Sequence, residues 1–208
     1  MDDSIHLQRA QRLVGVAIGT SLAMWYLPVL SGAACDQAQR ALIRAILKEF
    51  RRDGSDEEVD ALFNFLRTKL FFLHVVSYAP WIGTSAQVFE LYATGQLAIR
   101  CARDRSLTAL SDPMSFAGPW DEITNDIFSG NSVVASYEQF SGETFPSALR
   151  MPFVASVDGM ARAYRSIESI PGMMKAQEVA SETVRAAEEH VGKVLADSAN
   201  RLLGRFRR

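Results

Sequence analysis

Apolar residues recur along most of the chain at intervals of three and four positions, which is the spacing of one face of an α-helix. In the stretch 38–50 they fall at Ala38, Leu42, Ala45, Ile46 and Phe50, and charged residues occupy many of the positions between them. Strand-like alternation is scarce, and glycine and proline lie at intervals that suit turns between helices. The pattern therefore predicts an all-α protein.

Start and stop signals divide this pattern into separate helices. Ser55 and Glu58 form a capping box, in which the serine oxygen accepts an amide of the first turn and the glutamate reaches back to the Ser55 amide. Pro28 and Pro80 end apolar runs, because the residue before a proline is pushed out of the α region. The expected helices cover residues 4–26, 33–50, 55–79, 85–103, 132–140, 147–169 and 173–206, and the stretch 106–132 is expected to be a loop with short helical turns.

Two stretches of similar sequence suggest paired helical hairpins. When their prolines are aligned, Tyr26 and Pro28 match Tyr78 and Pro80. Each unit consists of an apolar helix, a Tyr-x-Pro turn and an amphipathic helix. Joined at residues 53–54, two such apolar helical hairpins would form a four-helix arrangement, because short connections favour antiparallel neighbours.

Further helices and a long C-terminal helix are expected to follow. We predict an apolar hairpin region at 1–105 and, at 106–208, a loop plus amphipathic helices that pack on it; a single domain over 1–208 is the alternative. The last helix carries a heptad-like seam, which favours packing inside the chain over a homo-oligomer contact. The seam positions are Ala180, Val184, Ala187, Val191 and Val194.

The apolar runs allow three interpretations. Residues 13–35 and 70–89 contain no Asp, Glu, Lys or Arg, and each has about the 20-residue length of a membrane-spanning helix. Pro28 and Pro80, however, shorten the uninterrupted helices to about 15 and about ten residues, which is more typical of core or interfacial helices. A secretory signal is favoured by Arg9 and Arg12 before the first run, but the acidic N-terminus opposes it. We expect a helical core whose apolar hairpins either pack on themselves or enter a bilayer.

Aromatic residues and glycines of these runs are the candidates for contacts. Trp25, Tyr26 and Trp81 are predicted to contact a membrane interface or a partner. Glycines allow helices to approach one another closely. Helix-packing roles are therefore assigned to Gly15, Gly19, Gly83 and Gly95.

The C-terminal sequence RLLGRFRR is the strongest local charge signal, since no acidic residue follows Asp197. A basic helix end that also carries aromatic and aliphatic side chains suits an anionic membrane surface. A frayed terminus whose arginines complement the helix dipole is the alternative. The predicted contact residues are Arg201, Arg205, Phe206, Arg207 and Arg208.

Composition narrows the chemistry. The 208 residues are 48% hydrophobic and carry a formal net charge of −2, so nothing points to nucleic acid. The two cysteines and three histidines have no metal-ligand spacing, and neither a phosphate-binding loop nor a nucleophile elbow is present. Asp121 and Glu122 are expected to belong to a solvated helix start, and Glu90 is expected to end a buried face. We therefore predict no catalytic, cofactor or metal residues and a protein that is not an enzyme.

The sequences LPVLSGAACDQAQRALIRAILKEF and LFFLHVVSYAPWIGTSAQVFELYATGQLAIRCA resemble the hydrophobic helical domain appended to certain bacterial GTPases, a family of uncharacterised domains. The resemblance covers about the first half of the chain. It implies association with membranes and a GTPase partner, and it transfers no catalytic residue. The matching residues are Pro28, Gly32, Asp36 and Gln39 in the first stretch and Pro80, Gly83, Thr94 and Gly95 in the second.

Together these observations predict a non-enzymatic, membrane-associated helical scaffold or partner-binding protein. We expect it on the cytoplasmic side of a bacterial inner membrane, as a peripheral or integral protein. One alternative is a soluble cytoplasmic helical bundle that binds an apolar ligand or a helical partner. Another is a membrane-perturbing protein whose hairpins move from a soluble core into lipid.

Overall fold

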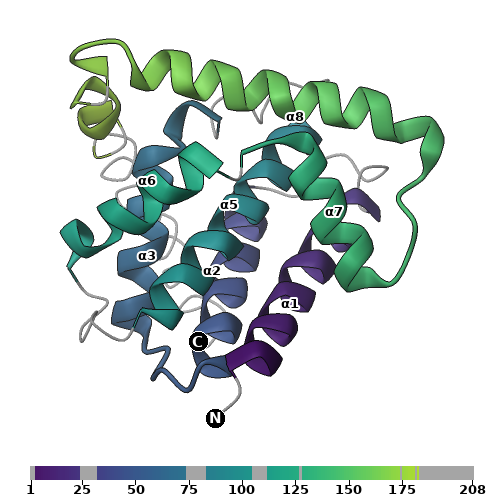
Figure 1. Ribbon diagram of the computed structural model, residues 1–208. Helices are drawn as coiled ribbons and strands as arrows, with labels where there is room; N and C mark the ends of the chain where they lie inside the picture. Colours follow the sequence, from purple (N-terminus) through teal and green to yellow (C-terminus); the bar gives the residue numbers. More distant parts are fainter. Residues whose placement is uncertain are drawn as a thin grey trace, which may run out of the picture.

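Helices are the regular elements of the computed structural model, which describes residues 3–23, 32–73, 83–104, 112–126, 128–173, 175–180 and 182. No strand occurs among these residues, so the prediction of an all-α protein is confirmed (Figure 1). In chain order the elements are α1 (Asp3–Ala23), α2 (Gly32–Glu49), α3 (Asp56–Lys69), α5 (Gly83–Arg103), the 3-10 helix η2 (Pro113–Phe116), α6 (Ala117–Asp126), α7 (Gly130–Ser141) and α8 (Ser147–Glu168).

Helix α3 starts as a capping box. The Ser55 Oγ accepts the Glu58 amide at 3.3 Å, and three acidic residues occupy the first turn, where the helix dipole favours negative charge. The Glu58 carboxylate accepts the Gly54 amide at 3.0 Å, so it reaches one residue further back than the capping box predicts. The box is consistent with the observed start of α3.

Helix α3 does not continue to residue 79 as expected. It ends at Lys69, and Leu70 leaves the helical conformation with φ −100° and ψ 13°. Residues 71–73 are helical again. At the break the Lys69 carbonyl accepts a hydrogen bond from Gln177 Nε2 at 3.3 Å. The local sequence pattern could not reveal this tertiary contact.

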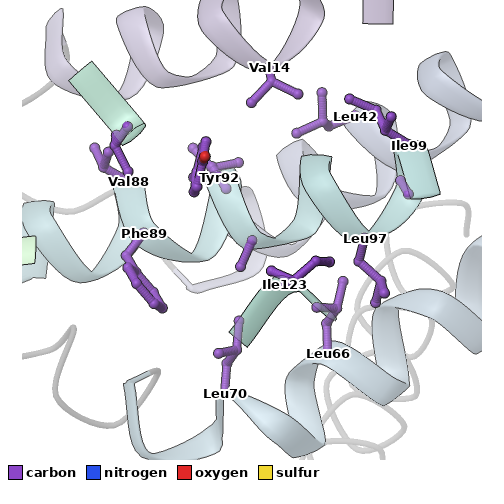
Figure 2. Packing of buried hydrophobic residues seen from close by; sticks show 14 of the residues in the cluster. Val14, Leu42, Leu66, Leu70, Val88, Phe89, Tyr92, Leu97, Ile99 and Ile123 are labelled. Atoms are coloured by element: carbon purple, nitrogen blue, oxygen red, sulfur yellow. The ribbon is translucent and has the colours of Figure 1, made fainter. Parts of the chain in front are cut away.

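Helix α5 is the centre of the molecule. Nearly every residue from Gly83 to Ala102 is buried, which is the property of a helix with neighbours on all sides. Figure 2 shows side chains of α1, α2, α3 and α6 pointing toward it, among them Val14, Leu42, Leu66 and Ile123. The apolar character of this part of the sequence is therefore explained by burial inside protein.

Polar contacts set the directions of the first four long helices. Arg44 pairs with Asp56 and Arg67 with Asp36, so α3 runs antiparallel to α2. His6 at the start of α1 bonds Glu49 at the end of α2, so this pair is antiparallel as well. Gln39 in the first half of α2 bonds Glu90 in the first half of α5, and Arg52, just after α2, donates to the Ala102 carbonyl near the end of α5, so α2 and α5 run parallel.

One end of the molecule is consequently formed by the ends of α1 and α3 and the starts of α2 and α5. We call it the junction end and define it by Ala23, Gly32, Leu73 and Gly83. The turn 50–55, which connects α2 to α3, lies at the opposite end.

Helices of the second half complete the same core. Helix α7 packs along α1, where Tyr137 approaches Gly19. Helix α8 lies crosswise to α5 and α7 (Figure 1). Trp120 of α6 donates a hydrogen bond to Tyr164 of α8 at 3.1 Å in the core. The α8 residues that face the core follow helical spacing: Phe153, Val157, Met160, Ala161 and Tyr164.

Candidate functional site at the junction end

The residues predicted to touch a membrane or partner lie outside the described residues, and so does most of the expected C-terminal helix. This applies to Trp25, Tyr26, Trp81, Arg201, Arg205, Phe206, Arg207 and Arg208. What the structure does describe is the set of helix ends that border these parts of the chain.

Two apolar sequences start and finish at the junction end. The first, residues 24–31, connects Ala23 to Gly32, and the second, residues 74–82, connects Leu73 to Gly83. Neither sequence contains Asp, Glu, Lys or Arg. Histidine is absent from the first and occurs once, as His74, in the second. The described residues that border both predicted proline turns thus belong to the same end of the molecule.

A small polar recess lies between α2, α3 and α5 near this end. Its open space, including the mouth, is about 250 Å³. The buried Gln39 amide donates to Glu90 Oε2 at 3.1 Å, and Arg67 lies 3.8 Å from Asp36. Apolar walls are supplied by Phe63, Leu66 and Leu70.

Charges in the recess act on the neighbouring thiol. Burial, followed by the negative charges of Glu90 and Asp36, raises the pKa of Cys35. The thiol therefore keeps its proton at neutral pH, and a protonated thiol is a poor nucleophile. The recess does not activate Cys35 for covalent chemistry.

Glu90 is the residue of this site that sequence reasoning missed. It was expected to end a buried face, but it lies inside α5 and is only 3% exposed. The expectation is wrong because α5 is covered on all sides. The signal in the sequence was a glutamate flanked by Val88, Phe89 and Leu91, because a carboxylate within an apolar run indicates burial. A buried carboxylate requires a polar partner. That partner is Gln39, 51 positions earlier in the chain.

The residues of the family resemblance are not gathered at one point. Asp36 and Gln39 line the recess, whereas Thr94 is fully buried further along α5. Pro28 and Pro80 lie outside the described residues.

The four glycines assigned to helix packing lie in α1 and α5. A Cβ on Gly95 would lie 2.4 Å from Val14 Cγ2, so α1 and α5 approach each other closely there. A Cβ on Gly19 would lie 3.4 Å from the Tyr137 ring. Gly15 and Gly83 are buried.

The start of the C-terminal segment also reaches the junction end. Residues 175–180 are helical, and Gln177 is the side chain that bonds the last carbonyl of α3. We call the described residues 175–180 and 182 the C-terminal arm. The basic residues 201–208 follow this arm in the sequence.

Groups for metal or acid–base chemistry are not assembled in the described part of the chain. No cluster of three His, Cys, Asp or Glu side chains that could hold a metal ion occurs there. Asp121 and Glu122 are exposed, and Glu122 pairs with Arg100, which is the arrangement of a solvated helix surface.

Comparisons with known proteins and the hydropathy of the helices complete the description. No family model, curated protein or solved structure matches the chain. Among the described residues, no helix has both the length and the apolar character needed to cross a membrane.

Proposed function

We propose that this protein is a non-enzymatic helical scaffold that attaches to an anionic membrane surface through its junction end. The observation that carries the proposal is that Ala23, Gly32, Leu73 and Gly83, which border both apolar connecting sequences, lie at one end of the molecule. Tryptophan and tyrosine favour the membrane–water interface, and residues 24–31 and 74–82 contain Trp25, Tyr26, Tyr78 and Trp81.

The basic C-terminal sequence supports the same orientation. The arm that precedes it in the chain contacts Lys69 near the junction end, and the sequence beyond the arm carries the arginines. Each basic residue near an anionic bilayer contributes about 1 kcal/mol of attraction. Apolar insertion combined with basic attraction is the usual pair of signals for stable peripheral attachment.

The proposed mode of attachment is peripheral. The described helices bury their apolar faces against one another, with α5 at the centre, so their folding needs no lipid. The surface we propose is the cytoplasmic face of a bacterial inner membrane. The resemblance of the first half of the chain to a GTPase-associated domain adds a GTPase as the proposed class of protein partner.

Vesicle sedimentation tests this function. We expect the full chain to sediment with vesicles of phosphatidylglycerol and phosphatidylcholine, and to bind at least tenfold less after the double substitution W25E/W81E, because charged residues are expelled from the apolar interface. The matched control is Met114→Glu, which places the same charge at a methionine that is 79% exposed on η2. It should bind like the wild type. Absence of wild-type binding, or equal loss in the control, would reject the proposal.

A further inference from the structure

Most of the described side chains of the C-terminal arm are exposed. It follows Pro171 and Gly172, and Gly172 has a left-handed φ of 80° that turns the chain after α8 (Figure 1). Within the arm only Gln177 is buried, and Ala180 is half-buried. The other described side chains are exposed, and Val179 is 56% exposed.

Gln177 attaches the arm with one half of its amide group. Its Nε2 donates to the Lys69 carbonyl at 3.3 Å, which is long for a hydrogen bond. Its Oε1 is also buried and accepts no hydrogen bond in the part of the chain that the structure describes. Burying an oxygen that gains no hydrogen-bond donor costs desolvation free energy. This cost is similar in size to the net stabilisation that one hydrogen bond provides.

The seam of the expected C-terminal helix passes through the same residue. Counting back from Val184 in steps of four and three gives Ala180 and Gln177. Gln177 therefore occupies a seam position, whereas the later seam positions up to 194 are alanine or valine. A polar residue at a packing position lowers the stability of a docked helix. The exposed charged side chains of the arm, Lys175, Glu178 and Glu182, add little, because surface ion pairs are weak.

We propose that the C-terminal arm is a latch at the junction end, with docked and released states of similar free energy, and that Gln177 sets the balance. In the docked state the arm covers the end of α3. In the released state the end of α3 is exposed. Any role of this release in lipid binding rests on the proposed function; the latch itself does not require a membrane.

Hydrogen exchange of the full chain without lipid tests the latch. We expect the amides of 175–180 to exchange at least about 100-fold faster than those of α5, as in a locally opening segment. Gln177→Leu removes the unsatisfied oxygen and keeps the side-chain volume, so it should slow exchange in the arm by about tenfold. The control A176L places leucine at the neighbouring exposed position and should leave exchange within threefold of wild type. Gln177→Glu buries a charge and should speed exchange in the arm, while unchanged α5 amides show that the fold is intact.

Two results would overturn the latch. One is protection of the wild-type arm equal to that of α5, which would show a firmly fixed segment. The other is an unchanged or faster exchange of the arm in Q177L, which would show that the amide hydrogen bond holds it. Since lipid is absent, a negative vesicle experiment would reject the proposed function without affecting this result.

Discussion

The contact between Gly95 of α5 and Val14 of α1 predicts that Gly95→Ala destabilises the wild-type protein but stabilises a variant with alanine at position 14. Both helices are buried along this line, and Val14 is fully enclosed. A methyl group added at Gly95 would lie 2.4 Å from Val14 Cγ2 and 3.1 Å from Cγ1. No real contact of this kind is so short, so Val14 or the two helices must move when Gly95→Ala is introduced.

The magnitude follows from two opposing effects. Overpacking a core costs roughly 1–3 kcal/mol, and alanine is about 1 kcal/mol better than glycine inside a helix. Gly95→Ala should therefore lower the free energy of unfolding by up to about 2 kcal/mol. Val14→Ala removes both clashing methyl groups and by itself leaves a cavity. In that background the new methyl at position 95 fills the space, so G95A should raise the free energy of unfolding.

Urea denaturation followed by far-UV circular dichroism measures the four members of this cycle. The expected coupling is about 1–3 kcal/mol with an unchanged m-value. Gly159→Ala is the control, because a Cβ on this α8 glycine meets no atom within 4 Å; it should stabilise the protein by up to about 1 kcal/mol. If G95A had the same effect with valine and with alanine at position 14, within about 0.5 kcal/mol, the close approach of α1 and α5 would be refuted.

Three further predictions concern other parts of the fold. Gly130→Ala should destabilise the protein by about 2–3 kcal/mol in thermal unfolding, because its Cβ would lie 2.6 Å from the Val154 backbone, which cannot rotate away; wild-type stability would contradict the packing of α7 on α8. Ser55→Ala should cost about 1 kcal/mol through loss of the α3 cap, and Ser55→Asp should retain most of the stability in the same urea assay. Burial raises the pKa of Cys101 from near 9 to about 12, so the folded protein holds a proton that the unfolded chain releases. Its contribution to stability is present below pH 9 and is lost between pH 9 and 12. Cys101→Ala should therefore flatten the fall in stability over that range, and an unchanged pH dependence would count against a deeply buried thiol.

The all-helical fold and several helix starts could be predicted from the sequence because they depend on local signals. The capping residue Ser55 and the helical spacing of apolar residues act within one or two turns, and the structure has α3 beginning directly after Ser55. The expected helices at 85–103 and 147–169 likewise correspond closely to α5 and α8. The α8 start has no side-chain cap, so there the helical spacing of apolar residues is the local signal.

Contacts between distant residues could not be predicted in the same way. The break of α3 at Leu70 accompanies a bond between Lys69 and Gln177, which are 108 positions apart. The burial of Glu90 depends on α5 being surrounded by other helices, among them α6 and α8 from the second half of the chain. An apolar run with one carboxylate looks the same in sequence whether it ends a buried face or is the centre of a core.

Fluorescence quenching by brominated lipids is the most direct test of attachment through the junction end. Three single-tryptophan variants would be compared in anionic vesicles, retaining Trp25, Trp81 or Trp120. Trp120 is the internal reference, because it is fully buried in the aromatic core and bonds Tyr164. We expect bromine to quench Trp25 and Trp81 strongly and Trp120 hardly at all. Equal quenching at all three positions, or none at Trp25 and Trp81 in vesicle-bound protein, would contradict the account.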